Sequence, residues 1–257
     1  MHFTYLSVMN KTLITAALIF TAFAAQAQQT TNNDMTPDDA KKWQDPEYSF
    51  HNDWPNIRKY QNENSKLPPP APGENRIVFM GNSITEFWKV NDPGYFTTYI
   101  NRGISGQTTP QMLVRFREDV INLKPAVVVI LAGINDIAQN TGPIKLEDTF
   151  GNIISMVQLA RAENIKVVMS SALPANHFPW RPAITPTEKV IALNKMLKDY
   201  ADANHIVYLD YYSAMVDDQK GLPSALSGDG VHPNLAGYKV MEPLAEQAIA
   251  EALKRRH

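Results

Sequence analysis

Two short segments, far apart in the chain, hold residue types that work together in nucleophilic catalysis. Ser83 lies in a Gly-Asn-Ser-Ile sequence, and Asp229 and His232 lie in an Asp-Gly-Val-His-Pro sequence. A serine hydroxyl is a poor nucleophile until a base takes its proton, and histidine is a base near neutral pH. A carboxylate three residues before the histidine can hold its Nδ1 proton and fix its tautomer. These residue types predict acyl-transfer chemistry, provided that the fold brings Ser83 and His232 together.

Two segments between Ser83 and Asp229 supply hydrogen-bond donors. Gly103 and Gly106 lie in a Gly-Ile-Ser-Gly-Gln-Thr sequence, where glycine lets the backbone turn with positive φ and approach a ligand. Asn135 lies in a Gly-Ile-Asn-Asp sequence and can point its side-chain amide into a site. Each segment also has a plain structural explanation, as a helix cap or a turn. For Asp136 we expect such a role, either capping the next helix or bonding to the loop around Ser83.

The elements that must position these residues alternate along the chain. Strands are predicted from apolar runs at residues 76–80, 99–101, 126–131, 166–171 and 205–209. Helices are predicted between and after them, at residues 109–123, 146–163, 187–204 and 234–255. This alternation predicts an α/β fold with a parallel sheet and right-handed crossovers. In such sheets ligands bind outside the carboxyl ends of the strands, and three of the four segments directly follow a strand.

The order and spacing of the four segments resemble the SGNH hydrolase superfamily, the GDSL-like lipase/acylhydrolases. The resemblance covers about residues 76–253. It implies a three-layer α/β/α sandwich, flavodoxin-like, with a five-stranded parallel sheet. Many members have an aspartate before the serine, and this chain has Asn82. We expect Asn82 to keep the capping and turn-forming capacity and activity to be retained, because Asp229 is the residue that orients the histidine.

The resemblance also implies a role for each residue of the site. The catalytic residues would be Ser83 as nucleophile, His232 as base and Asp229 as the residue that orients the base. The oxyanion hole would consist of the backbone N–H groups of Ser83 and Gly106 and the side-chain amide of Asn135. Gly103 is the less favoured choice for the glycine. No metal or other cofactor is expected.

For the substrate, the resemblance favours short acyl esters, with O-acetyl groups on carbohydrate as the leading candidate. The residues expected to line the substrate site are Trp88, His177, Trp180 and Arg181, with Tyr95 and Phe178 as further aromatic candidates. Other enzymes of the same fold remain open, namely a lysophospholipase, a thioesterase or an arylesterase. So does a non-catalytic carbohydrate-binding relative. A flavodoxin-like nucleotide binder is disfavoured, because the first loop lacks the lysine of a P-loop.

Composition limits the partners. The 257 residues are 44% hydrophobic and 19% charged, as in ordinary globular proteins. The net charge is −2, so the sequence does not predict the positive electrostatic potential that attracts nucleic acid. The chain has no cysteine, so disulfides and thiolate metal sites are excluded. The expected partner is a small-molecule or glycan ester, and the sequence leaves the oligomeric state open.

The N-terminal region is predicted to lie outside the hydrolase domain. Lys11, an apolar run over residues 13–25 and small residues up to Ala27 are typical of a secretory signal peptide at residues 1–27. An uncleaved anchor is the alternative. Export to the periplasm or beyond is therefore expected, without stable membrane insertion after cleavage. Residues 28–72 are predicted to form an N-terminal extension ending in a proline-rich linker, and residues 73–257 the SGNH hydrolase domain.

Overall fold

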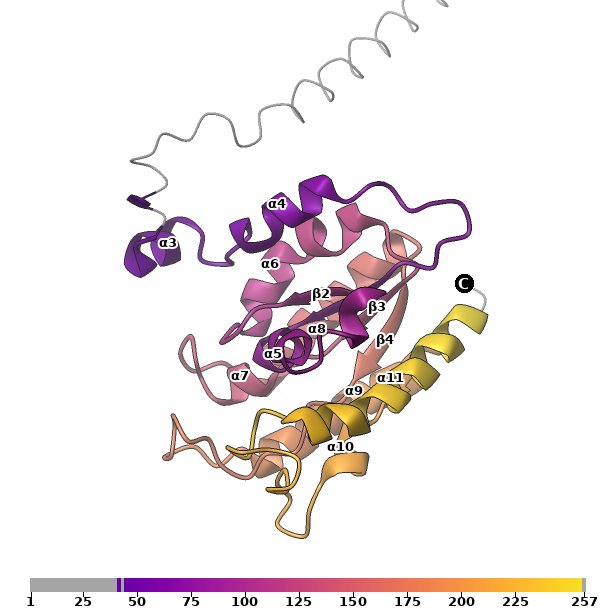
Figure 1. Ribbon diagram of the computed structural model, residues 1–257. Helices are drawn as coiled ribbons and strands as arrows, with labels where there is room; N and C mark the ends of the chain where they lie inside the picture. The colour runs from indigo at the N-terminus through magenta and orange to yellow at the C-terminus, as the bar shows by residue number, and fades with distance from the viewer. Residues whose placement is uncertain (1–40, 43, 256–257) are drawn as a thin grey trace, which may run out of the picture. The chain divides into compact units, whose positions relative to one another are not determined.

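The computed structural model describes residues 41–42 and 44–255 (Figure 1). The predicted signal peptide lies outside the described residues. The chain divides into two units, residues 1–52 and residues 53–257. In the first unit, helix α3 (Pro46–Asn52) begins after Asp45, whose carboxylate accepts the N–H of Glu47 at 2.9 Å. Of the helices in the described part of the chain, none has the length and apolar character needed to cross a membrane.

The second unit is built on a five-stranded parallel sheet. Its strands are β1 (Ile77–Gly81), β2 (Ile100–Gly103), β3 (Val127–Ile130), β4 (Lys166–Ser170) and β5 (Val207–Leu209). The strand order is β2-β1-β3-β4-β5, and every neighbouring pair is parallel. The predicted α/β fold is confirmed. The strands are almost wholly apolar because helices cover both faces of the sheet.

Helices form a layer on each face of this sheet (Figure 1). One face is covered by α5 (Ser83–Asn91) and α11 (Leu235–Lys254). The other is covered by α6 (Thr109–Asp119), α8 (Leu146–Ala162) and α9 (Thr187–Ala203). The predicted three-layer sandwich is confirmed.

Shorter elements complete the unit. They are α4 (Arg58–Lys66), which packs on α6, α7 (Ile134–Ile137), α10 (Tyr211–Met215) and the 3-10 turns η1 (Tyr95–Thr97) and η2 (Ile121–Leu123). The helix predicted at residues 109–123 differs in detail. It ends as an α-helix at Asp119, and η2 then ends at Lys124 in a left-handed conformation, φ 51°.

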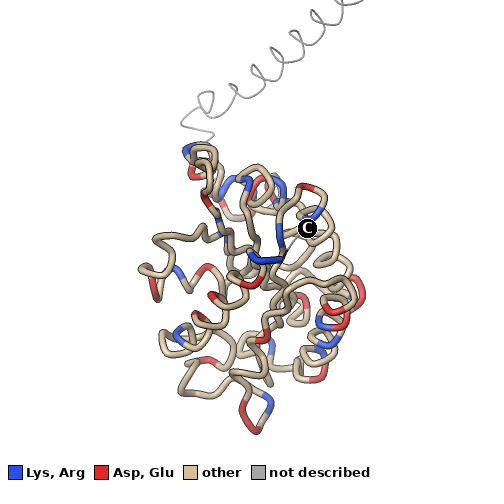
Figure 2. The backbone as a smooth tube through the Cα atoms, turned by 90° about the vertical axis from the view of Figure 1, so that its right-hand side faces the viewer, with Lys and Arg blue, Asp and Glu red and all other residues tan. Residues whose placement is uncertain are grey.

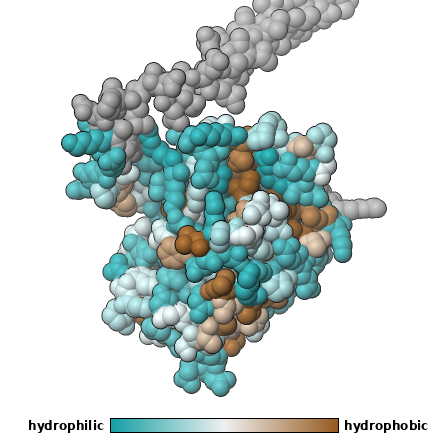
Figure 3. Space-filling model, in the orientation of Figure 1, coloured by the Kyte–Doolittle hydropathy of each residue, from teal (hydrophilic) through white to brown (hydrophobic). Residues whose placement is uncertain are grey.

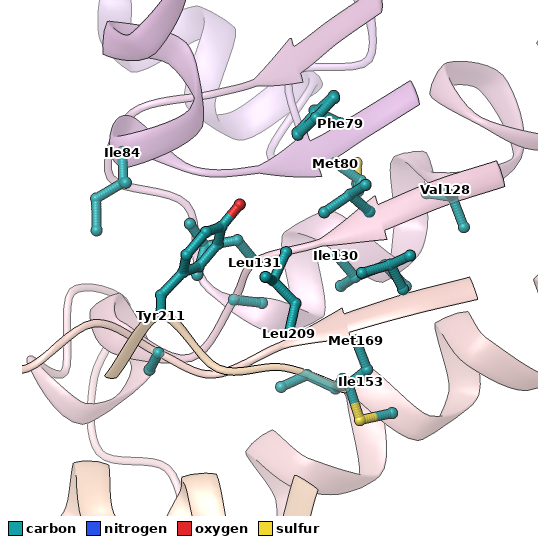
Figure 4. Packing of buried hydrophobic residues seen from close by; sticks show 14 of the residues in the cluster. Phe79, Met80, Ile84, Val128, Ile130, Leu131, Ile153, Met169, Leu209 and Tyr211 are labelled. Atoms are coloured by element: carbon teal, nitrogen blue, oxygen red, sulfur yellow. The ribbon is translucent and has the colours of Figure 1, made fainter. Parts of the chain in front are cut away.

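The core fixes the carboxyl ends of the strands. Met80 of β1, Ile130 of β3 and Met169 of β4 are paired in register and therefore lie on one face of the sheet, where they belong to the same buried cluster as Ile153 of α8 (Figure 4). From β1 the chain passes to β2 on one side, whereas β3 pairs with β1 on the other side. Such a switch point leaves a crevice between the carboxyl ends of β1 and β3. Ser83 follows β1 there, and Asn135 follows β3.

Surface charge in the described residues is mixed. Lysine and arginine residues are interspersed with aspartate and glutamate residues over the backbone, without a large region of one sign (Figure 2). On α9, for example, Lys195 pairs with Asp199 and Lys198 with Asp202, each four residues apart. Such exposed pairs contribute little to stability but keep charges of both signs dispersed.

Candidate active site

Strand β1 brings Ser83 to the first residue of α5. The turn between them is tight, because a Cβ atom added at Gly81 would lie 2.0 Å from Oγ1 of Thr85. Only glycine lets the strand end this close to the helix that follows it. The Ser83 side chain therefore lies at a helix N-terminus, where free N–H groups favour developing negative charge.

Asn82 does not cap α5 as expected. It occupies the N-cap position, but its side chain makes no capping hydrogen bond. The residue is 1% exposed, and neither atom of its side-chain amide has a hydrogen-bond partner. The side chain therefore satisfies none of the N–H groups of the first helical turn, whereas the backbone carbonyl of Asn82 accepts the N–H of Glu86 at 2.9 Å. Asn82 thus takes part in the turn through its backbone alone.

His232 lies beside Ser83 although 149 positions separate the two residues in the sequence. The Oγ of Ser83 and Nε2 of His232 are 2.9 Å apart, and Nδ1 of His232 is 2.7 Å from Oδ2 of Asp229. The turn that holds them is closed by Oδ1 of Asp229, which accepts the N–H groups of Val231 at 2.9 Å and His232 at 2.8 Å. The structure therefore brings together the three residues predicted from the sequence. They form one hydrogen-bonded row.

The Asp229 carboxylate is held in its ionised form. Partial burial acts to raise its pKa, but hydrogen bonds from the His232 ring and from the backbone of His232 and Val231 outweigh it and lower the pKa to about 2. An ionised carboxylate on Nδ1 keeps the proton on that nitrogen. Nε2 of His232 is then free to accept the proton of Ser83.

The two residues predicted as oxyanion donors follow β2 and β3: Gly106 lies in a loop, and Asn135 lies in the short helix α7. Gly106 is exposed and has φ 77°, a conformation that favours glycine. Asn135 is buried, and its Nδ2 donates to the carbonyl of Gln107 at 3.0 Å. This bond joins α7 to the loop after β2 and uses one of the two amide hydrogens of Asn135. Gly103 has a different task, since a Cβ atom there would lie 2.2 Å from the backbone N of Glu86.

Asp136 joins two helix starts rather than capping one. Its carboxylate accepts the backbone N–H of Thr109 at 3.0 Å and the Thr109 hydroxyl at 2.6 Å. The expected structural role is therefore present, but the partner lies at the start of α6 and not in the loop around Ser83. Burial raises the pKa of Asp136 to about 6, although the Thr109 hydrogen bonds act to lower it.

Aromatic rings flank His232 on two sides. The Phe87 ring centroid is 5.4 Å from that of His232, and the Trp180 centroid is 5.8 Å from it. Both side chains are partly exposed. Over the face of the molecule seen in Figure 3, apolar groups form small patches among hydrophilic ones. Nε1 of Trp180 donates to Oδ1 of Asn140 at 3.1 Å, and Nδ2 of Asn140 donates to the carbonyl of Gly106 at 3.2 Å. Asn140 thus links the Trp180 loop to Gly106.

Trp88 does not line a substrate site, contrary to expectation. It is 1% exposed, because it stacks between the rings of Tyr95 and Tyr238 at centroid distances of 4.9 and 5.3 Å. Phe178 is fully buried as well. These rings belong to the core between α5 and α11 or beneath the Trp180 loop. Of the aromatic candidates, Trp180 is the one that the structure places beside His232.

His177 and Arg181 are both exposed in the loop after β4. His177 packs on the turn that carries Asp229, since a Cβ atom added at Gly230 would lie 2.5 Å from its Cε1. Its Nδ1 lies 2.8 Å from Oδ1 of Asn176. Arg181 donates its backbone N–H to the carbonyl of Phe178 at 3.0 Å. A substrate contact for either residue stays a prediction.

Three residues around the site were not singled out from the sequence. Phe87 lies one helical turn after Ser83, and that spacing is a signal that it shares the face of α5 with the serine. Ser227 accepts the Gly230 N–H at 2.9 Å and donates to the His232 carbonyl at 2.7 Å, so it closes the Asp229 turn. Asn140 carries no comparable signal, because its two partners lie in different loops.

This arrangement can transfer an acyl group. A serine at a helix start, a histidine within hydrogen-bond distance and an ionised aspartate behind it are the parts that nucleophilic catalysis needs. Among residues 41–42 and 44–255, no group of three histidine, aspartate or glutamate side chains could hold a metal ion. The decisive comparison is a match to the GDSL-like lipase/acylhydrolase family over residues 79–240, a range that contains the whole site. The chain belongs to this family. By class it is a carboxylic ester hydrolase.

Relatives within and around this family agree with the fold and the class. A crystal structure of a GDSL-like lipase from Bacteroides thetaiotaomicron shares 51% sequence identity, with a TM-score of 0.76, covering 77% of this chain and 99% of that chain. Esterase TesA of Pseudomonas aeruginosa is 31% identical over 149 residues, which are 58% of this chain and 67% of the relative. Acetylxylan esterase of Geobacillus stearothermophilus is 28% identical over 151 residues, which are 55% of this chain and 67% of the relative.

Proposed function

We propose that the protein is an exported serine esterase that removes short acyl groups, with O-acetyl groups of carbohydrates as its substrates. The observation that carries the proposal is the row of hydrogen bonds from Ser83 through His232 to Asp229, at 2.9 and 2.7 Å. In the proposed reaction His232 Nε2 takes the hydroxyl proton while Oγ of Ser83 attacks the ester carbonyl. The carbonyl oxygen becomes an oxyanion.

The oxyanion is stabilised by three donors in this proposal: the backbone N–H of Ser83, the backbone N–H of Gly106 and the second amide hydrogen of Asn135. One such donor is worth about 3–4 kcal/mol of transition-state stabilisation. The protonated His232 gives its proton to the leaving alcohol oxygen, and an acyl-serine remains. Water then attacks the acyl-serine and passes a proton to His232. His232 returns it to Oγ of Ser83 as the acid leaves.

The substrate proposal is supported by the surroundings of His232. Trp180 and Phe87 offer partly exposed rings on which a sugar face can stack, and aromatic rings are common platforms for such amphipathic ligands. The relative from Geobacillus stearothermophilus is an acetylxylan esterase. Export is proposed from the sequence of residues 1–27. A periplasmic or secreted location would give the protein access to acetylated glycans.

The test compares p-nitrophenyl acetate, butyrate and octanoate as substrates for the mature protein and for Ser83→Ala. We expect hydrolysis fastest with acetate and none with the variant. Acetylated xylo-oligosaccharides then serve as the glycan substrate, with acetate release measured directly. Preference for octanoate would favour a lysophospholipase or thioesterase. Activity retained in Ser83→Ala would contradict the proposed nucleophile, and no turnover of any ester by the wild type would favour a carbohydrate-binding protein.

A further inference from the structure

Residues 53–60, here called the strap, pack against residues 103–108, here called the glycine loop. The strap precedes the part of the chain that matches the family, residues 79–240, and contains none of the predicted site residues. Its own shape is fixed by Asp53, whose two carboxylate oxygens accept the N–H groups of Ile57 and Arg58, both at 2.9 Å. A segment anchored in this way can serve as a support for its neighbour.

Gly106 needs such a support, because its own packing does not fix it. The residue is exposed, has φ 77°, and a Cβ atom added to it would meet nothing within 4 Å. A glycine in open space samples many backbone conformations. The direction of its N–H is therefore set by its carbonyl bond to Asn140 and by whatever holds the residues on either side.

The strap holds the residues before Gly106 in two ways. The buried hydroxyl of Tyr60 donates to the carbonyl of Gly103, at the start of the glycine loop. Lys59 forms an ion pair with Glu86, whose other carboxylate oxygen accepts the N–H of Ser105 at 2.6 Å. The peptide group that carries the Gly106 N–H directly follows Ser105. The N-terminal side of the glycine loop is thus tied to the strap and to α5.

The residue after Gly106 is held even more firmly. Nε2 of Gln107 donates to the carbonyl of Pro55 in the strap at 2.6 Å, and its Oε1 accepts Nε of the fully buried Arg115 at 2.6 Å. The backbone carbonyl of Gln107 accepts the Asn135 amide at 3.0 Å. One residue therefore joins the strap, the core and a second proposed oxyanion donor.

We propose that the strap is a positioning element of the active site, which fixes the glycine loop so that the Gly106 N–H and the Asn135 amide face the oxyanion. This inference rests on the proposed function, since it takes Gly106 and Asn135 as oxyanion donors. The strap touches no substrate in this proposal. Its effect falls on the transition state, where preorganised donors act, and not on substrate binding.

Two variants test the strap, each with a matched control. Tyr60→Phe removes the donor to Gly103, and Tyr208→Phe is its control, because the half-buried Tyr208 hydroxyl likewise donates to a carbonyl, that of Asn194. Lys59→Ala removes the ion pair with Glu86 from the surface and so tests the strap even if Tyr60→Phe fails to fold. Its control is Lys220→Ala, which breaks an exposed ion pair with Glu188.

Three readouts are measured: kcat and KM with p-nitrophenyl acetate, the rate at which diethyl p-nitrophenyl phosphate modifies Ser83, and amide hydrogen exchange in residues 103–108. We expect kcat and the phosphorylation rate to fall about three- to tenfold in Tyr60→Phe and about two- to fivefold in Lys59→Ala, as the loss of one hydrogen bond or ion pair predicts. KM should not change, exchange should be faster, and both controls should stay within about twofold of the wild type.

The possible failures are distinguishable. If folded Tyr60→Phe and Lys59→Ala keep the wild-type kcat and phosphorylation rate, the strap has a purely structural role and the inference is wrong while the proposed function stands. A fall in thermal stability without a fall in kcat has the same meaning. If the wild type hydrolyses no ester and Ser83 is not phosphorylated, the proposed function is wrong, and the inference fails with it.

Discussion

Replacing Asp229 with asparagine should reverse the tautomer of His232 while leaving its position intact. Oδ1 of Asp229 accepts the backbone N–H groups of Val231 and His232, at 2.9 and 2.8 Å. An asparagine must place its oxygen there, because its NH2 group cannot face two donors. The NH2 group then faces Nδ1 of His232, which has to become an acceptor. The ring proton moves to Nε2, the atom that must take the proton of Ser83.

The expected loss follows from these bonds. Turning the amide over, so that its oxygen could keep the proton on Nδ1, would break two hydrogen bonds of about 1 kcal/mol each and leave donors facing donors. The active tautomer is therefore disfavoured by at least about 3 kcal/mol, or roughly a hundredfold. The electrostatic support of the imidazolium is lost as well, and the same exchange in a serine protease triad lowers kcat by roughly 10⁴. We expect a fall of about 10³- to 10⁴-fold in kcat.

The assay is hydrolysis of p-nitrophenyl acetate at neutral pH by Asp229→Asn, with far-ultraviolet circular dichroism as the check of folding. The matched control is Asp210→Asn, because Asp210 also accepts a backbone N–H, that of Ser213 at 3.0 Å, but does so at the start of α10. The control should keep its activity within about twofold. If folded Asp229→Asn retains more than about a tenth of the wild-type kcat, the assignment of Asp229 as the residue that fixes the tautomer is wrong.

Three further predictions concern the surroundings of the site. Trp180→Ala should raise KM for an acetylated oligosaccharide about five- to tenfold, because the ring stacks on sugar in the proposal. The kcat for p-nitrophenyl acetate should stay within about threefold of the wild type. Equal glycan KM values for the wild type and the variant would refute this prediction. Asp136→Asn should remove a pH dependence of stability. Burial raises the pKa of Asp136 from 3.8 to about 6, so between these pH values the native state keeps a proton that the unfolded chain loses. In the wild type, the free energy of unfolding should therefore fall by up to about 3 kcal/mol as the pH rises from 3.8 to 6. Urea titrations of wild type and variant from pH 3.5 to 7 would show the difference, and parallel curves would contradict it. Gly230→Ala should destabilise the protein by about 1–3 kcal/mol and lower kcat, because φ of Gly230 is 78° and the new Cβ would lie 2.5 Å from the His177 ring. The control is Gly151→Ala, in an open position of α8, which should leave stability unchanged or raise it. Thermal unfolding of both variants measures the difference.

Strands and layers were the part of the fold that the sequence predicted well. Buried parallel strands are covered on both faces and therefore occur as unbroken apolar runs, such as Val127–Ile130. The strand predicted at residues 99–101 begins one residue before β2 and ends two residues before its end, because a charged residue such as Arg102 is typical of a loop. Its guanidinium is buried against Asn64, at 2.7 Å, and over the ring of Tyr60. A partner in another element cannot be deduced from the pattern around Arg102.

Within the site, the sequence predicted which residues lie together better than what surrounds them. Ser83, His232 and Asp229 could be selected because acyl-transfer chemistry restricts residue types and spacing, and the structure places them within hydrogen-bond distance of one another. The choice between Phe87 and Trp88 could not be made in this way. Adjacent residues of one helix face directions about 100° apart, and which of them faces the core depends on Tyr238, far along the chain.

The contact between Ser83 and His232 closes a loop of 149 residues. All five strands precede His232 in the chain, and α11 follows it, bonded to the nucleophile helix through the Tyr238 hydroxyl and the Ile84 carbonyl at 2.8 Å. During synthesis, therefore, the sheet can be complete while His232, the proposed base, is still missing. In the proposed mechanism, a chain cut before His232 hydrolyses no ester even when all five strands have folded. Esterase activity would then report that the chain has been made as far as His232 and that α11 has docked on α5.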